Sequence, residues 1–172
     1  MDGRHKGDEM GTRRMLNGTV VALASLSMAI IAGSPAGAAA QVSRGELHAF
    51  AAAISDPALA AEYGDIQGHA QMVRTADGKT IVTVHVTGLL GNVAYGSHVH
   101  KSACNAGDAD GHYRFDPNGP ANDQNEIWPS FTTNEDGVGN GRALTDRTAG
   151  PTAVSVVVHA PGGAKIGCAD LS

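Results

Sequence analysis

The stretch IQGHAQMVRTADGKTIVTVHVTGL, residues 66–89, decides the fold class. Both of its halves are rich in β-branched residues and alternate apolar with polar positions, which is the pattern of half-buried strands. The halves are joined by ADGK, residues 76–79, whose Asp-Gly pair is a strong signal for a tight hairpin turn. We therefore predict an antiparallel hairpin here, with an antiparallel sheet built around it.

The rest of the chain continues this pattern of short strands and glycine-rich turns. Further strands are predicted at 94–101, 126–134, 142–146 and 152–160, and residues 161–171 predict a glycine turn followed by a short final strand. The pair flanking EDGVGNG, residues 135–141, predicts a second hairpin, and the sparsely apolar stretch 104–125 predicts a long loop. Loops of that length in a small domain are usually functional. The pattern favours an all-β fold, a Greek-key, Ig-like β-sandwich or barrel of about eight antiparallel strands with one long loop.

The first forty residues have the layout of a secretory signal. Arg13 and Arg14 precede an apolar run that ends in small residues near Ala40, as in a basic region, a hydrophobic region and an Ala-x-Ala-like cleavage site. A membrane anchor is the alternative, but the apolar run is short for a span and no stop-transfer pattern follows. Residues 41–64 are alanine-rich, and we interpret them as a partly helical or disordered leader to a β-domain at 65–172.

The charge of the chain narrows the partners that it can have. The full chain carries −5, and removal of residues 1–40, with four basic and three acidic residues, leaves −6. An acidic, exported domain is a poor candidate for binding nucleic acid or an anionic membrane surface. We predict a secreted or extracytoplasmic protein with no membrane span after signal removal, and attachment to the envelope stays open. The expected state is a monomer or a weak homodimer.

Cys104 and Cys168 are the two cysteines of the chain. An even count in an exported protein favours a disulfide, and two free buried thiols are the alternative. A bridge across 64 residues would stabilise the fold by roughly 4 kcal/mol in the chain-entropy model.

Four histidines in three segments predict a metal site. His98 and His100 are two residues apart on a predicted strand, so their side chains share one face. Taken alone, this pair fits an exposed polar face better than a metal site. His112 lies in the predicted long loop, and His159 ends the most apolar strand. Four imidazoles together in an exported protein favour Cu(II), and zinc is the other candidate by ligand type.

The remaining four histidines receive no functional role. His69 and His85 alternate with apolar neighbours in the first hairpin, which is typical of exposed strand histidines. His48 lies in the predicted leader and His5 in the predicted signal segment.

Four segments together resemble the Cu/Zn superoxide dismutase family, in the family's order and approximate spacing. They are GSHVHKSAC (96–104), GDADGHY (107–113), VVVHA (156–160) and GGAKIGCADL (162–171). Each segment alone is a weak signal, but the combination is specific, and the resemblance covers most of residues 65–172. It implies the β-sandwich of that family.

The resemblance also implies roles for individual residues. His98, His100 and His159 match copper ligands, and His112 matches the histidine that bridges copper and zinc in the family. Cys104 and Cys168 match the family disulfide, which ties the loop beside the copper to the last strand.

Two departures from the family pattern modify this expectation. Gln124 and Ile127 stand where the family has a histidine and an aspartate of its zinc site, and no histidine lies between His112 and His159. The chain therefore resembles the copper-only branch of the family, with copper as the expected cofactor and zinc not expected. Lys165 stands at the position of an active-site arginine, where it keeps the charge but lacks the planar fork of donors.

The function implied by the resemblance is disproportionation of superoxide to oxygen and hydrogen peroxide by cycling between Cu(II) and Cu(I). Lys165, as a guide for the anion, and His112 are the expected catalytic residues. Without zinc, the second ring nitrogen of His112 needs another partner, and Glu126 and Asp110 are the candidates. A copper-binding or copper-buffering protein with little turnover is the main alternative. An inert sandwich with vestigial histidines is the third hypothesis.

Overall fold

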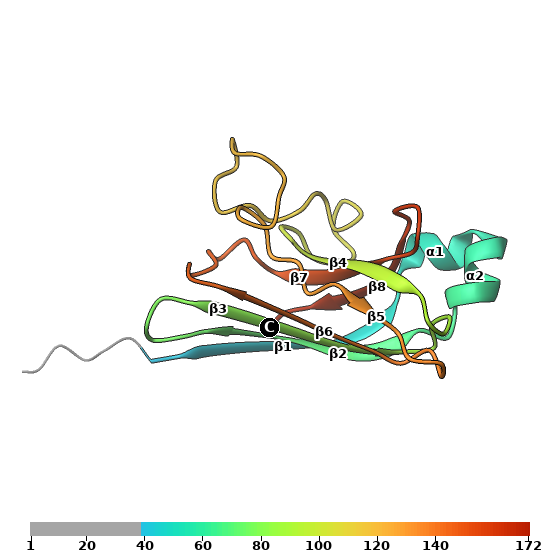
Figure 1. Ribbon diagram of the computed structural model, residues 1–172. Coiled ribbons are helices and arrows are strands. Elements are labelled where there is room, and N and C mark those ends of the chain that lie inside the picture. Colours follow the sequence, from blue (N-terminus) through green and yellow to red (C-terminus); the bar gives the residue numbers. More distant parts are fainter. Residues whose placement is uncertain (1–38) are drawn as a thin grey trace, which may run out of the picture. The chain divides into compact units, whose positions relative to one another are not determined.

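The computed structural model in Figure 1 describes residues 39–172 of the chain. The predicted signal segment, residues 1–40, therefore lies almost entirely outside the described residues. Within the described part, no helix is both long and apolar enough to cross a membrane.

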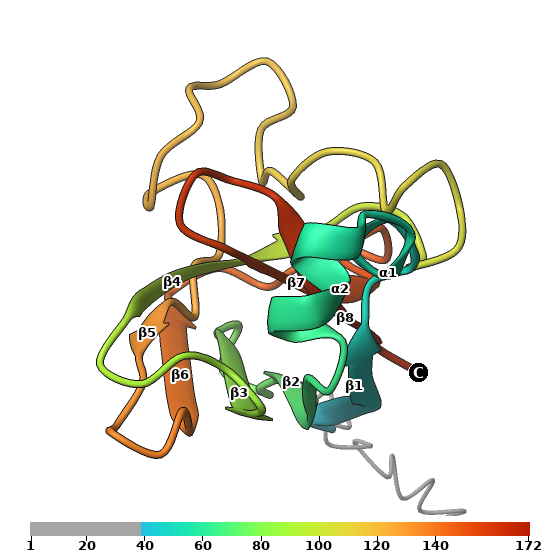
Figure 2. The same ribbon diagram turned by 90° about the vertical axis from the view of Figure 1, so that its right-hand side faces the viewer.

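Eight antiparallel strands form one sheet that curls over itself into two layers. The strands are β1 (Gln41–Ala49), β2 (Gln67–Arg74), β3 (Thr80–Thr87), β4 (Ala94–His100), β5 (Phe131–Thr132), β6 (Gly139–Thr145), β7 (Ser155–His159) and β8 (Lys165–Asp170). Their order in the sheet is β5-β4-β7-β8-β1-β2-β3-β6. Figure 2 shows β1, β2, β3 and β6 in one layer and β4, β7 and β8 in the other. The predicted all-β sandwich or barrel is confirmed.

The hairpin that decides the fold class is β2 with β3. Residues 67–74 pair with residues 80–87 in an unbroken antiparallel register. Gly78 takes a φ of +86° in the connecting turn, a backbone conformation that favours glycine. Alternate side chains of both strands point into the core; these are Ala70, Met72, Thr80, Val82, Val84 and Val86. Both the hairpin and its inward face follow from the sequence pattern.

The prediction that residues 41–64 form a leader outside the domain is wrong for its first half. Residues 41–49 form β1, which pairs with β2 on one side and with β8 on the other. Leu47 is its one fully buried side chain, so the apolar alternation that marks a strand is nearly missing. Backbone hydrogen bonds to two neighbours position this strand instead. The domain therefore begins by residue 41.

The second half of the predicted leader is helical, as expected. Helix α1 (Ala51–Ser55) and helix α2 (Pro57–Tyr63) lie between β1 and β2 in the chain, at one end of the two layers (Figure 1). Asp56 caps α2, because its side chain accepts hydrogen bonds from the backbone N–H groups of Ala58 and Leu59.

The predicted second hairpin is present only in its turn: Asn134 N donates to Val138 O at 2.9 Å, but no ladder joins β5 to β6. β5 pairs with β4, whereas β6 pairs with β3, so the two consecutive strands lie at opposite edges of the sheet. The turn between them passes from one layer to the other. Gly139 lies directly against the Phe131 ring, where a Cβ would come within 2.2 Å of ring carbons. The glycine-rich turn therefore serves a crossing between layers, which a sequence pattern cannot distinguish from a hairpin turn.

A long loop joins β4 to β5 and carries one half of the candidate site. It spans residues 101–130 and is attached to the end of β4 by an isolated bridge between His100 and His112. The loop lies over the layer that contains β4 and β7 (Figure 2). The predicted disulfide is confirmed: Cys104 near the start of this loop is bonded to Cys168 of β8, with Cα atoms 5.9 Å apart.

Candidate metal centre

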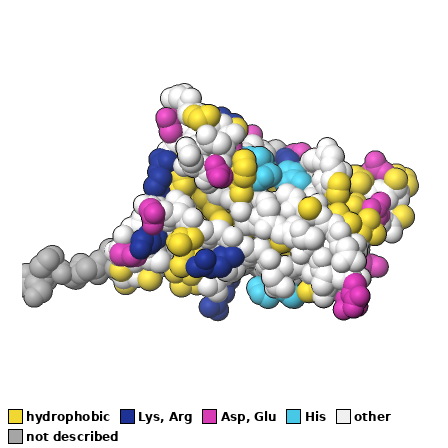
Figure 3. Space-filling model, in the orientation of Figure 1, with side chains coloured by type: hydrophobic (Ala, Val, Ile, Leu, Met, Phe, Trp, Pro, Cys, Tyr) yellow, Lys and Arg dark blue, Asp and Glu magenta, His cyan; other side chains and the backbone are white. Residues whose placement is uncertain are grey.

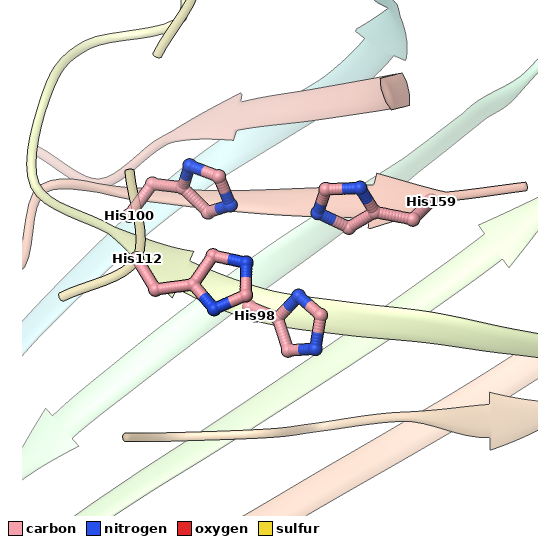
Figure 4. A group of neighbouring side chains, drawn as sticks. All are labelled: His98, His100, His112 and His159. Carbon is pink, nitrogen blue, oxygen red and sulfur yellow. The ribbon is translucent and has the colours of Figure 1, made fainter. Parts of the chain in front are cut away.

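The structure brings His98, His100, His112 and His159 into one group. One ligand atom from each of the four residues lies within 4.8 Å of those of the other three. His98 and His100 project from the outer face of β4, and His159 ends the neighbouring strand β7. His112 arrives from the long loop. Figure 4 shows the four rings around a common space, with His100 and His112 on one side and His159 on the other.

Three ring nitrogens in this group are buried without any hydrogen-bond partner: Nδ1 of His98, Nε2 of His100 and Nε2 of His159. The opposite nitrogens of His100 and His159 are held by backbone carbonyls. Nδ1 of His100 lies 3.2 Å from Ala109 O and 3.1 Å from Asp110 O, and Nδ1 of His159 lies 3.0 Å from Gly163 O. A carbonyl only accepts, so each Nδ1 carries the proton and each Nε2 keeps its lone pair.

This arrangement fits a metal ion. Buried polar atoms are nearly always hydrogen-bonded, so three neighbouring buried nitrogens without a partner are consistent with a bound ion between them. A metal-binding histidine is usually oriented by a hydrogen bond from its other ring nitrogen, for example to a backbone carbonyl. Imidazole ligands suit zinc, copper, iron and nickel.

Burial also keeps these histidines neutral. Desolvation lowers the pKa of His98 to about 3 and the pKa of His100 to about 4, and neighbouring histidines add to both shifts. Desolvation lowers the pKa of His159 below its ordinary value as well. The lone pairs are therefore available for a metal throughout the neutral pH range.

The metal-free protein is expected to lose stability as the pH falls from about 6.5 towards 4. Histidines of the unfolded chain take up protons near pH 6.5, whereas folded His98 and His100 stay neutral. Acid therefore favours the unfolded chain in this window, and above it both states are neutral and these groups cause no pH dependence. Denaturant unfolding of metal-free protein across the window measures the effect. A free energy of unfolding that does not change there would contradict the assigned burial.

Glu126 is the centre of the hydrogen bonds behind His112. Its side chain is 1% exposed, and it accepts three hydrogen bonds. Nδ1 of His112 donates to Oε2 at 2.6 Å, Nε1 of Trp128 donates to Oε2 at 2.8 Å, and Nε of Arg114 donates to Oε1 at 3.0 Å. Of the two partners predicted for His112, the structure selects Glu126 over Asp110, whose carboxylate instead pairs with Lys101 at 3.2 Å.

The charge of Glu126 is set by a balance of burial and hydrogen bonding. Burial raises the pKa of its carboxyl, but the hydrogen bonds from Trp128, His112 and Arg114 outweigh burial and hold the pKa below its usual range. The group is thus a carboxylate at neutral pH and keeps a proton on Nδ1 of His112. Nε2 of His112 is then left for the common space. Sequence reasoning missed Arg114 and Trp128, because nothing in their spacing shows that they meet on one carboxylate.

Lys165 lies beside the group but its ammonium is engaged. It stands opposite His159 across the β7–β8 pair, and its side chain is 21% exposed. The Nζ atom donates to the backbone carbonyls of Asp108 and Asp110 and lies 3.3 Å from Oδ2 of Asp108. A positive charge is therefore present near His159, although the ammonium group that carries it is hydrogen-bonded to Asp108 and Asp110 of the loop.

The loop segment held by Lys165 has an unusual backbone. Residues 107–110, Gly-Asp-Ala-Asp, all have positive φ, between 48° and 58°. Such left-handed conformation costs non-glycine residues roughly 1–2 kcal/mol each. It turns the carbonyls of residues 108–110 towards Lys165 and His100, so the contacts with these two side chains offset the cost.

The site opens to the surface on one face of the molecule (Figure 3). His98 and His112 are only partly buried, whereas His100 and His159 are buried, with 1% and 9% of their surface exposed. Trp128 is 38% exposed and its ring meets that of His98 edge-on, with centroids 5.5 Å apart. A small molecule can therefore reach the rim of the histidine group from solvent.

The fold and this group define the class of the protein: a β-sandwich with a candidate metal centre on an outer face. Among solved structures, 122 chains match it. One of them, described as the clock protein EA4, superposes with a TM-score of 0.53 and 17% sequence identity, covering 76% of this chain and 93% of that chain. At this identity the similarity shows the fold alone. No family model and no curated protein matches the sequence.

Proposed function

We propose that this chain is an exported, copper-dependent protein of the superoxide dismutase type, which disproportionates superoxide to oxygen and hydrogen peroxide. The observation that carries the proposal is the group of four imidazoles, whose ligand atoms lie within 4.8 Å of one another and three of which have a buried nitrogen without a hydrogen-bond partner. Nitrogen ligands of this kind favour copper. The resemblance of the surrounding segments to that family supports the choice of substrate.

The exported location is supported by the bridge between Cys104 and Cys168. Disulfides persist in oxidising compartments and are rare in the cytosol. The bridge fixes the start of the long loop to β8, which places the loop over the histidines.

His98, His100, His112 and His159 would hold the ion, and a bound copper would supply one-electron redox chemistry between Cu(II) and Cu(I). The chain's own residues set the conditions for it. Glu126 orients the ring of His112 and keeps the proton at Nδ1. The carbonyls of Ala109 and Gly163 do the same for His100 and His159.

Turnover by the copper-loaded full chain tests the proposed activity. Superoxide decay is followed with protein carrying copper and, as the control, with protein carrying zinc, which cannot cycle by one electron. The proposal expects acceleration by the copper form alone. Bound copper without acceleration would contradict dismutase activity and leave the copper-buffering hypothesis, which the engagement of Lys165 with Asp108 and Asp110 favours.

Substitution of Lys165 tests whether its charge guides the anion. Lys165→Met is expected to lower kcat/KM for superoxide about tenfold at low salt, because local positive charge raises the encounter rate of a small anion. Lys165→Arg keeps the charge and is expected to keep most of the rate and its decrease with salt. If Lys165→Met shows the rate and the salt dependence of the unsubstituted protein, Lys165 holds only the loop.

A further inference from the structure

A second group of metal-binding side chains lies on the other layer of the sandwich. Glu46 of β1, His69 of β2, His85 of β3 and Asn140 of β6 form one continuous row across four neighbouring strands. Each is directly opposite the next in the strand register. The inward positions of β2 and β3 are filled by apolar core residues such as Met72, so this row faces outward.

The two histidines of the row are spaced as metal ligands are in this protein. The ring centroids of His69 and His85 are 5.3 Å apart and the rings are inclined by 34°. Within the four-histidine group, the corresponding distances run from 4.1 Å for His98 with His112 to 6.0 Å for His112 with His159. The strand pairing holds the two rings side by side, so little conformational freedom is lost when an ion binds.

His85 is also oriented in the same way as two members of that group. Its Nδ1 lies 2.9 Å from Oδ1 of Asn140. The amide oxygen accepts, so Nδ1 carries the proton and Nε2 keeps the lone pair. The carbonyls of Ala109 and Gly163 act identically on His100 and His159.

The surroundings leave room for an ion and offer a third ligand. His69 and His85 line a groove of about 290 Å³ together with Glu46, Gln67 and Thr87. Glu46 is exposed and stands opposite His69, so its carboxylate can turn towards the imidazoles. Figure 3 shows histidine side chains at two separate places on the surface, one on each layer.

We propose that His69 and His85, with Glu46, form a second site for a divalent ion of the copper and zinc class, positioned by Asn140. Two imidazoles and one carboxylate are a common donor set for such ions. The site is weaker than the four-histidine group because it has fewer nitrogen ligands and is open to solvent. It stands independently of the proposed dismutase activity.

Copper titration of the full chain tests the second site. Without a competing ligand, the unsubstituted protein is expected to bind two Cu(II) ions, the second more weakly. The double variant His69→Ala/His85→Ala is expected to bind one ion and to retain the first with unchanged affinity. Asn140→Ala is expected to weaken the second ion about tenfold, the usual effect of losing a residue that orients a ligand. Thr83→Ala, at the next outward position of β3, is the matched control and is expected to keep both ions.

Broadening of imidazole resonances by Cu(II) locates each ion and separates this inference from the proposed function. Broadening of the His69 and His85 resonances by Cu(II) supports the second site whether or not the four-histidine group binds an ion. A second ion retained by His69→Ala/His85→Ala, or a total of one ion in the unsubstituted protein with no broadening of His69 and His85, overturns it.

Discussion

His100→Ala is expected to abolish tight copper binding and, with it, superoxide turnover. His100 is 1% exposed and is the most deeply placed member of the group. Loss of a residue that only hydrogen-bonds to a metal ligand usually costs about 10–100-fold in metal affinity. Loss of the ligand itself should therefore cost more than about 100-fold. The effect is measured as the copper retained after dialysis against glycine, a weak competitor that is expected to remove copper from the proposed second site.

The control for His100→Ala must separate lost binding from lost folding. The substitution removes the ring donor from the carbonyls of Ala109 and Asp110, at a cost of about 1–3 kcal/mol. The Asp110 carbonyl keeps its hydrogen bond from Lys165. His98→Ala removes a less buried ligand and is expected to lose tight copper with a smaller change in stability. His48→Ala removes an exposed imidazole of β1 and should keep tight copper. Tight copper in a folded His100→Ala protein would refute the assigned ligand set.

Glu126→Ala is expected to destabilise the metal-free protein by about 3 kcal/mol. Removal of one partner of a buried ionic group typically costs about 3–5 kcal/mol, and the lower end applies because the side chains of His112 and Arg114 are 30% and 36% exposed. Three donors lose their acceptor at once. Copper affinity should also fall about 10–100-fold, since His112 is no longer oriented.

Two variants calibrate this result. Glu126→Gln preserves the shape but replaces one acceptor oxygen with a donor, so it is expected to fall between Glu126→Ala and the unsubstituted protein. Glu135→Ala removes an exposed carboxylate from the turn after β5, and its effect should stay within about 0.5 kcal/mol. If chemical denaturation gives the same small change for Glu126→Ala and Glu135→Ala, the carboxylate does not organise the site.

The local sequence pattern was sufficient to predict a strand where that strand buries apolar side chains. The β2–β3 hairpin and β7 follow from apolar alternation, a turn signal or an apolar run. β1 was missed because two neighbouring strands position it through the backbone, while Leu47 is its one fully buried side chain. The pairing of β5 with β4 and of β6 with β3 was missed because the turn between β5 and β6 says nothing about which neighbour each strand will pair with.

In the candidate site, too, some residues could be predicted from the local sequence pattern and others could not. His98 and His100 share a strand face by simple periodicity, so their proximity could be predicted. His112 and His159 join them through the long loop and β7, and resemblance to a family placed them, not spacing. The role of Glu126 was one of two alternatives in the sequence, and the structure decided between them because burial and three convergent donors are tertiary properties.

The most direct test of the account is the metal content of the full chain after exposure to equal copper and zinc, followed by dialysis against glycine and elemental mass spectrometry. The account predicts about one copper and no zinc per chain, and loss of that copper in His100→Ala. One tightly held copper together with one tightly held zinc would mean that the chain has a second tight site besides the four histidines. A folded chain that retains no copper would contradict the central claim that the four histidines form a copper centre.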